Sequence, residues 1–214
     1  MITRYCLIRN QTVIADGKVI FTLPPGKLDD FLEAAYAFLK VDYPKFYKMD
    51  NLSKLGFLAA EVLLKDRELV KEYDAENVAL VLSNAHSSLD TDLRYNESAK
   101  TLASPALFVY TLPNIVAGEI CIRHKIKGEN AFFISPAFDP ELLADYVSMV
   151  ASPQHSPMAN TQNPIPNSCI AGWVDVMGGH HDVFLYLLEK NKHGLLEHTA
   201  EQLGKIYNTE LWNN

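Results

Sequence analysis

Residues 102–135 read LASPALFVYTLPNIVAGEICIRHKIKGENAFFIS and combine a loop, a helix, a basic segment and a short apolar run. Pro113 suits the first turn of a helix, because its missing N–H would have no partner there. The helix over 114–121 carries the small pair Ala117 and Gly118. Residues this small predict a helix that packs very close to another backbone.

A basic segment follows the predicted helix, at the end where the helix dipole favours positive charge. Gly128 then turns the chain into the apolar, aromatic run AFFI at 131–134. This run predicts a short strand that is buried on both faces. The basic residues are Arg123, His124, Lys125 and Lys127.

The order and spelling of these pieces resemble the N-terminal half of the β-ketoacyl synthases, which are condensing enzymes of the thiolase superfamily. A weaker resemblance covers 43–96 and the chain from Cys169 onward. It implies a thiolase-like half of a condensing enzyme, as a single domain over 1–214. The matching words are Ser104-Pro105, Phe108, TLPN at 111–114, AGEI at 117–120, Ile122-Arg123 and IKGEN at 126–130.

In that family the strand equivalent to 132–135 is followed at once by the nucleophilic cysteine, at the start of a helix. Here the chain continues as SPAFDPE, so the nucleophile position falls on Pro136 or Ala137, and neither can form a thioester. Pro136 also lacks the backbone N–H that would serve an oxyanion hole. Ser135 is the nearby hydroxyl, but a serine before proline is typical of a cap or turn. We therefore predict no catalytic residue here.

The remaining elements predict a layered α/β domain in which helices sandwich a mainly five-stranded mixed sheet. Asp16-Gly17 predicts a hairpin turn between the first two strands, and Asp50 and Asp139 predict helix caps. The polar stretch 84–96, which lacks glycine, predicts a loop. Predicted strands cover 5–8, 19–23, 77–83, 168–176 and 183–188, and predicted helices cover 28–39, 52–63, 140–150 and 194–207.

Residues 151–167 contain four prolines and three asparagines with little apolar content, which predicts a long loop insertion. Two interpretations stay open for this loop. It is either a flap or arm that binds a partner, or a mobile surface insertion.

Histidines and cysteines offer little chemistry in this sequence. His86 lies in the predicted 84–96 loop, where solvation or a hydrogen bond to the backbone is the ordinary role. His180 and His181 are adjacent on a strand and point to opposite faces, so they do not converge on a metal. Cys6, Cys121 and Cys169 are widely spaced and match small buried hydrophobes of a reducing compartment. We expect no metal and no cofactor. Two further histidines, His193 and His198, also miss the spacing of a helical metal pair.

Composition places the chain among globular proteins. Its 214 residues are 48% hydrophobic and 21% charged, with a net charge of −7. The acidic balance argues against a nucleic-acid surface, and no segment has the roughly 18 apolar residues of a membrane span. With no signal peptide at the N-terminus, we expect a cytoplasmic protein.

Three functions are compatible with these observations. The first is a non-catalytic ketosynthase-like protein that acts as a structural or chain-length-shaping partner in bacterial fatty-acid or polyketide-type (polyene) biosynthesis. The second is a 3-oxoacyl-[acyl-carrier-protein] synthase component that is active only with a complementary subunit. The third is an unrelated hydrolase that uses Ser135 with a histidine.

The resemblance also implies two surfaces. Basic positions of the family match Arg123, Lys125 and Lys127, which predicts a docking site for an acidic acyl carrier protein; a solvated helix exit is the alternative. The strand at 131–134 predicts a homodimer, or a heterodimer with a full-length ketosynthase, whereas a central strand of a monomer is the alternative. Predicted interface residues are Phe108, Tyr110, Ala117, Gly118, Phe132 and Phe133.

Overall fold

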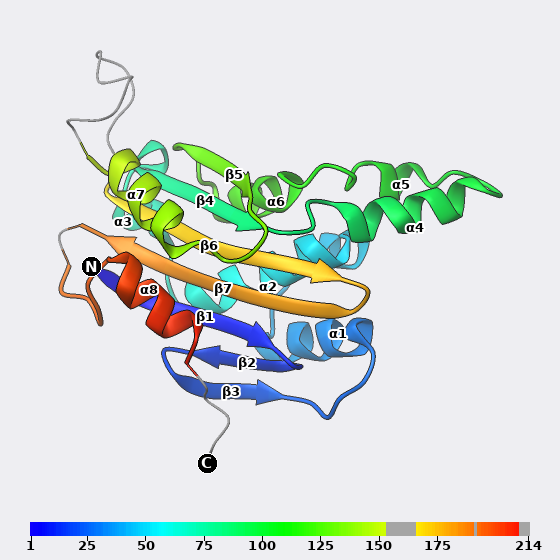
Figure 1. Cartoon of the computed structure of the whole chain (residues 1–214), viewed down its shortest axis with the longest axis horizontal. Helices are drawn as coiled ribbons and strands as arrows, with labels where there is room; N and C mark the ends of the chain where they lie inside the picture. The colour runs from blue at the N-terminus through cyan, green and yellow to red at the C-terminus, as the bar shows by residue number, and fades with distance from the viewer. Residues whose placement is uncertain (153–165, 191, 210–214) are drawn as a thin grey trace.

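A computed structural model describes residues 1–152, 166–190 and 192–209 (Figure 1). Strands are β1 (Ile2–Arg9), β2 (Thr12–Ala15), β3 (Lys18–Thr22), β4 (Val78–Asn84), β5 (Asn130–Ile134), β6 (Ser168–Met177) and β7 (His180–Glu189). Helices are α1 (Leu28–Leu39), α2 (Asn51–Leu63), α3 (Leu69–Glu72), α4 (Leu89–Ala99), α5 (Pro105–Phe108), α6 (Ile115–His124), α7 (Pro140–Val150) and α8 (Ala200–Tyr207), with 3-10 turns η1 (Pro44–Lys48) and η2 (Ala75–Asn77).

The described strands form one mixed sheet in the order β3-β2-β1-β7-β6-β4-β5. β4 is parallel to both β5 and β6, and the other pairs are antiparallel. The sheet therefore has seven strands, and the expected five-stranded sheet was too small. β1 and β3 correspond to the predicted strands 5–8 and 19–23, and the strand that no prediction covered is β2.

The N-terminal meander explains the error. Asp16 and Gly17 do form a tight turn with positive φ, but this turn joins β2 to β3. A second turn at Asn10 and Gln11, with φ of 45° and 56°, joins β1 to β2. Neither residue of this second turn is glycine, so the sequence carried no strong signal for the four-residue strand between the turns.

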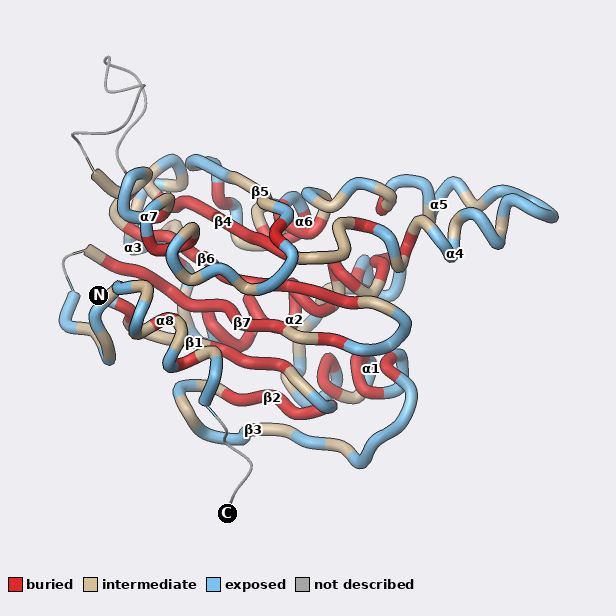
Figure 2. The backbone as a smooth tube through the Cα atoms, in the orientation of Figure 1, coloured by how far each residue is buried: buried red, intermediate tan, exposed pale blue. Residues whose placement is uncertain are grey.

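Helices cover both faces of the sheet, which confirms the layered α/β/α class (Figure 1). α1, α2 and α6 pack on one face, and α7 and α8 pack on the other. α2 is the most deeply buried helix, and its tube is red along most of its length in Figure 2. Asp50 caps it as predicted, accepting a hydrogen bond from the Ser53 backbone N–H.

Close packing between α2 and α6 depends on a glycine that the sequence analysis did not select. A Cβ atom added to Gly56 of α2 would lie 2.4 Å from the Val116 side chain of α6. Ala117 is buried, but Gly118 is exposed, and a Cβ atom added to it would meet no other atom within 4 Å. The small-residue face is therefore supplied mainly by α2. Pro113 also lies outside α6, which starts at Ile115.

The sequence predicted a loop over residues 84–96, and this prediction is wrong. They contain the end of β4, a short turn and the start of α4. α4 and α5 form a projection, which we call the arm (residues 89–112), on the right of Figure 1. Within the described residues of α4, Thr91 alone is buried, so the apolar periodicity that would predict a helix is missing.

β5 is an edge strand with exposed ends and a partly buried middle. The expectation of a strand buried on both faces is therefore wrong, and so is the alternative of a central strand. The aromatic side chains led to this expectation, and each of them is in fact partly buried on one face of the sheet. Phe132 packs on the α2 side and Phe133 on the α7 side.

The C-terminal elements follow the sequence closely. Asp139 caps α7 by accepting a hydrogen bond from the Leu142 backbone N–H, and β6 and β7 pair over their whole lengths. α8 begins at Ala200, so the predicted helix from 194 was too long. Most of the predicted 151–167 insertion lies outside the described residues. Within the described ranges, none of the helices combines the length and apolarity that a bilayer crossing requires.

Candidate functional site

The end of β5 leads into the position where the resemblance places a nucleophile. Ser135 is buried, and its backbone N–H donates to the Asn84 carbonyl oxygen at 2.9 Å. Pro136 has no N–H and Ala137 no reactive group. In the described part of the chain, no histidine forms a hydrogen bond with Ser135, so this serine lacks the base that a nucleophile needs.

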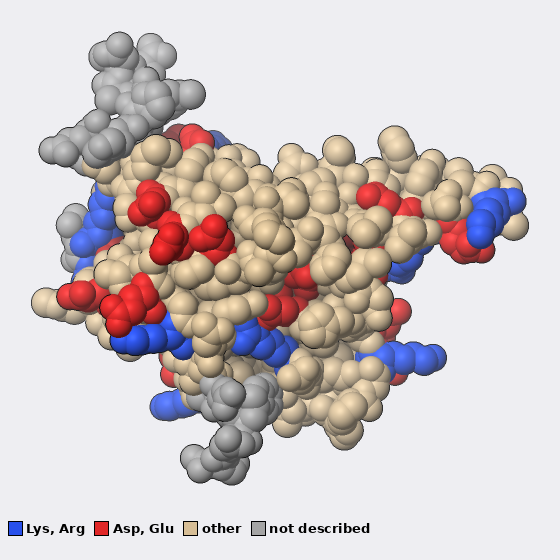
Figure 3. Space-filling model, viewed as in Figure 1, with Lys and Arg blue, Asp and Glu red and all other residues tan. Residues whose placement is uncertain are grey.

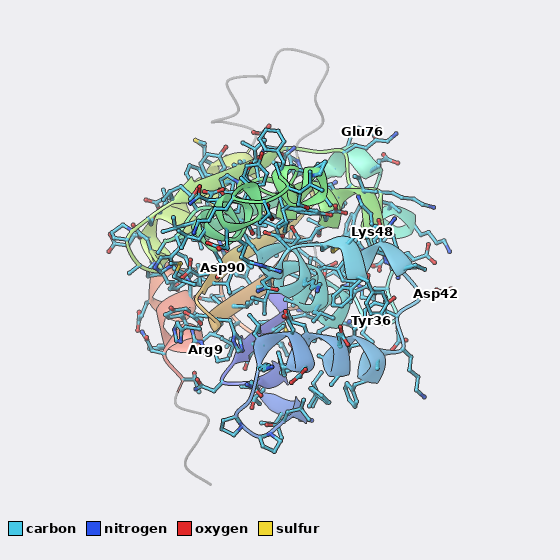
Figure 4. The ribbon with its side chains drawn as sticks, turned by 90° about the vertical axis from the view of Figure 1, so that its right-hand side faces the viewer. Arg9, Tyr36, Asp42, Lys48, Glu76 and Asp90 are labelled. Carbon is cyan, nitrogen blue, oxygen red and sulfur yellow. The ribbon has the colours of Figure 1, made fainter. Side chains whose placement is uncertain are left out.

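An aromatic cluster occupies the sheet face beside this turn. Phe138 stacks on Tyr207 of α8 with ring centroids 4.1 Å apart, and it also contacts Trp173 and Phe184. On the far side of Tyr207 lies the guanidinium of Arg9, 4.1 Å from the ring centroid. Figure 4 shows Arg9 next to α8. The cluster attaches α8 to the sheet and fills the space beside the turn with side chains.

The cysteines do not supply an alternative nucleophile. Cys6 and Cys169 are fully buried, and burial raises the pKa of each thiol far above its usual value. Cys121 lies within α6, where burial raises its thiol pKa to about 11. All three thiols are therefore protonated and unreactive at neutral pH, and the structure describes them as free.

His86 has a defined partner that the sequence analysis missed. Its Nδ1 lies 2.7 Å from Asp175 Oδ2, and Asp175 Oδ1 accepts the backbone N–H groups of Ala85 and His86. The pair joins the ends of β4 and β6, which are adjacent but far apart in sequence. No local pattern links the two residues. Their geometry fixes the turn that leads into the arm.

The histidines of the Gly178–Asp182 segment have separate roles. His180 is exposed, whereas His181 is buried and lies 3.3 Å from the backbone nitrogen of Gln11, whose N–H it accepts at Nε2. Burial lowers the pKa of His181, which keeps the ring neutral. A search of the described residues finds no group of three or more His, Cys, Asp or Glu side chains that would hold a metal.

The basic residues at the end of α6 border a cleft of about 960 Å³. Arg123 and Lys125 line the cleft, and Lys127 is not one of its lining residues. Arg123 is neutralised by Glu61, with Nε–Oε1 and Nη2–Oε2 distances of 2.7 and 3.2 Å. Lys127 lies 3.9 Å from Glu76, and no ion pair is found for Lys125 among the described residues. Lys125 ends α6 in the left-handed conformation.

Acidic and basic side chains alternate around this cleft. It lies between the ends of α1, α2 and α6, and Glu68 pairs with Lys71 on its wall. Its charge is therefore mixed and not strongly basic.

Exposed apolar side chains concentrate on the arm and the β5 edge. In Figure 3 the upper middle of the visible face, over β5, is largely uncharged, whereas the arm carries acidic side chains along its length and a charged pair, Lys100 and Glu97, near its tip. An uncharged surface of this kind is typical of a protein contact. The exposed residues of this surface, which we call the apolar surface, are Leu89, Leu93, Leu102, Phe108, Val109, Leu112 and Ile134.

The predicted interface residues are divided between this surface and the interior. Phe108 is 59% exposed, whereas Tyr110 and Ala117 are buried within the chain and cannot be exposed anchors. Phe133 contacts Tyr146 edge-to-face, so its ring belongs to the α7 side of the core. The sequence analysis did not select the other exposed residues, which are Leu89, Leu93, Leu102, Val109, Leu112 and Ile134.

No family model and no curated protein matches this chain. Solved structures do match. A chain from the complex of the ketosynthase ApeO with its chain length factor ApeC from Xenorhabdus doucetiae has a TM-score of 0.56 and 11% identity, covering 98% of this chain and 92% of that chain.

Two further structures match a part of their chains. AntDE:AntF, a type II polyketide synthase acyl-carrier protein in complex with its ketosynthase bound to the hexaketide, gives a TM-score of 0.55 at 13% identity. A β-ketoacyl synthase from Burkholderia phymatum STM815 gives 0.52 at 10% identity. Each match covers 88% of this chain, which spans 62% and 58% of the respective relatives. The chain therefore shares its fold with chains of these ketosynthase structures.

Proposed function

We propose that this chain is a non-catalytic ketosynthase-like subunit that pairs with a ketosynthase, or with a second copy of itself, through the β5 edge and the arm. Its role is that of a structural or chain-length-shaping partner in bacterial fatty-acid or polyketide-type biosynthesis. The observation that carries the proposal is the apolar surface, which an isolated chain would expose to water.

Chain length supports the same role. The match extends over nearly all of this chain and of the matched chain from the ApeO–ApeC complex. This chain and the matched chain therefore have comparable lengths. In that complex one protein is described as a ketosynthase and the other as its chain length factor. A heterodimer of this kind would give a non-catalytic ketosynthase-like chain a partner that performs the chemistry.

The absence of condensation activity is the first property to test. Ser135, Pro136 and Ala137 offer no thiolate and Pro136 no N–H donor at the end of β5. We expect no condensation of acyl and malonyl carrier-protein substrates and no malonyl decarboxylation by the purified chain. Turnover above a boiled control would overturn the non-catalytic assignment and favour a component that a complementary subunit activates.

Pairing through β5 is the second property. The outer side of β5 has no strand partner in the described sheet, so its backbone can accept the strand of another chain. Light scattering at micromolar concentration should give twice the 24.0 kDa mass of the chain. A species of one chain mass rejects the homodimer and leaves the heterodimer, which co-purification with a full-length ketosynthase then tests.

Arg123, Lys125 and Lys127 form the proposed docking site for an acidic acyl carrier protein. Lys125 and Lys127 carry most of the charge available to a partner, because Arg123 is already paired with Glu61. Reversing both charges, as Lys125→Glu with Lys127→Glu, should weaken carrier binding and reduce its salt dependence. Unchanged binding would identify these residues as a solvated helix exit.

A further inference from the structure

The arm has a fixed direction although it buries almost none of its own surface. In Figure 2 most of α4 and α5 is exposed or intermediate. An isolated helix of 11 residues is marginal in water, and α5 has only four. Contacts at the root of the arm must therefore hold it. Tyr110 belongs to the hydrophobic core, and other contacts at the root are hydrogen bonds.

One contact holds the outgoing segment. The Thr91 hydroxyl donates to Asp50 Oδ2 at 2.6 Å, and Asp50 Oδ1 caps α2 by accepting the Ser53 N–H at 2.9 Å. Thr91 and Asp50 are 1% and 3% exposed. These hydrogen bonds satisfy both oxygens of a buried carboxyl group, so the arm and α2 share one hydrogen-bonding side chain.

A second contact holds the returning segment. The Tyr110 hydroxyl donates to Glu119 Oε1 of α6 at 3.1 Å, and Lys45 Nζ lies 2.8 Å from the other oxygen, Oε2. Tyr110 and Glu119 are both buried. The outgoing and returning segments are thus each fixed to a carboxylate that belongs to the body of the domain.

The two segments are also joined to each other and to the sheet. The Ser88 hydroxyl donates to the Thr111 carbonyl oxygen at 3.0 Å. Asp90 Oδ1 accepts the backbone N–H of Gly178, at the tip of the β6–β7 hairpin, at 3.0 Å. Figure 4 shows Asp90 at the root of the arm. These bonds leave the arm little freedom to pivot at its root.

We propose that Thr91–Asp50 and Tyr110–Glu119 form a clamp that sets the direction of the arm and so preorganises the partner-binding surface. Thr91 and Tyr110 are positioning residues, because they are buried within the chain and act through the exposed side chains of the arm. The proposal rests on the proposed function only where it concerns pairing. Preorganisation strengthens association because a fixed surface loses less conformational entropy on binding.

Hydrogen exchange of the isolated full-length chain tests the clamp without any partner. Thr91→Val keeps the shape of the side chain and removes its hydroxyl, and Tyr110→Phe does the same for the ring. We expect amide exchange in 92–109 to increase about tenfold or more in each variant, with β6 unchanged. Thr91→Ser retains a hydroxyl and should restore slow exchange. Thr101→Val, at an exposed threonine of the same arm, is the matched control.

Pairing of the chain with a second copy is the second measurement. At a concentration where half of the wild type is dimeric, Thr91→Val should dimerise about tenfold more weakly and Thr91→Ser like the wild type. Unchanged arm exchange in both Thr91→Val and Tyr110→Phe overturns the clamp. If the wild-type protein stays at the mass of one chain, this result contradicts the homodimer only. The amide exchange of the arm then remains the test of the clamp. Faster amide exchange in β6 of Thr91→Val would show that this variant unfolds. The arm exchange of Tyr110→Phe then tests the clamp.

Discussion

The two edges of the sheet differ in how they are protected from pairing with another strand. β3 begins with an exposed lysine, Lys18, and its pairing with β2 is interrupted by a register shift between Val13 and Ile14. Phe21 is covered by Phe38, with ring centroids 5.0 Å apart. Charges and bulges of this kind discourage edge-to-edge association.

β5 has neither form of protection. Its sequence NAFFI has no charged residue, and its pairing with β4 is regular along the whole strand. Ile134 is exposed at its end, as are six apolar side chains of the arm. This difference between the edges supports the proposal that β5 pairs with a partner and β3 does not.

Both edges depend on the same central strands, so the largest expected effect concerns the shared body. Glu189 of β7 is completely buried and accepts hydrogen bonds from Arg67 Nη1 and Nη2 and from the Tyr73 hydroxyl at 2.7–2.9 Å. Glu189→Gln removes the buried charge that Arg67 requires and should lower the free energy of unfolding by about 3 kcal/mol. Urea denaturation measures it.

The control for Glu189 is Glu201→Gln, which removes an exposed carboxylate paired with Lys205 in α8. Its urea midpoint should equal that of the wild type. If Glu189→Gln also leaves the midpoint unchanged, the buried network does not hold the sheet together, and neither edge is supported as described.

A matched pair of substitutions tests the difference between the edges directly. Ile134 of β5 and Val19 of β3 are 53% and 52% exposed. Ile134→Asp should weaken dimerisation on the order of 100-fold, because it places a charge in an apolar contact, whereas Val19→Asp should have no effect. Sedimentation across a dilution series gives both dissociation constants. The reverse result would assign pairing to β3.

Lowering the pH should reduce the free energy of unfolding of the domain before it affects either edge of the sheet. Burial lowers the pKa of His198 to about 4, and its Nε2 lies 3.1 Å from the Tyr186 hydroxyl. The unfolded chain takes up a proton near pH 6.5 and the folded chain does not, so stability is lost as pH falls below that value. Between pH 7 and pH 5 the loss from His198 should be about 2 kcal/mol.

Urea midpoints at the two pH values measure this effect, and His198→Gln should reduce the pH dependence by about this amount. Burial also lowers the pKa of His181 and His124, so a part of the dependence with the same sign remains in the variant. Hydrogen bonds from Arg67 and other donors lower the pKa of Glu189, and those from Arg67 and Lys192 lower that of Glu72 to about 2. Their contribution to stability is present above pH 4 to 5 and is lost in more acidic solution. A midpoint equal at pH 7 and 5 would contradict the buried, neutral state of His198.

The smallest expected effect concerns the arm. Phe108 and Tyr47 are both 59% exposed, but Phe108 belongs to the apolar surface and Tyr47 lies in η1. Phe108→Ala should weaken dimerisation about tenfold, whereas Tyr47→Ala should leave it unchanged. Light scattering over the same dilution series distinguishes the two, and equal effects would place the arm outside the interface.

Local sequence signals were sufficient where the cause is local. Asp50 and Asp139 predicted the starts of α2 and α7 because a side-chain cap acts within three residues. The buried strands β4, β6 and β7 were predicted because a continuous apolar run is compatible with few other environments. The family words in 104–130 gave the fold class, which the structural matches support.

The sequence by itself therefore determined the layered α/β fold, the caps of α2 and α7 and the absence of a cysteine after β5. Only the tertiary structure decided which strand lies at an edge, because edge position depends on the order of strands and not on their composition. It also brought His86 to Asp175 and Thr91 to Asp50, from 89 and 41 positions away along the chain. Such pairs leave no periodicity, since each residue suits a polar loop or an ordinary helix until folding supplies its partner.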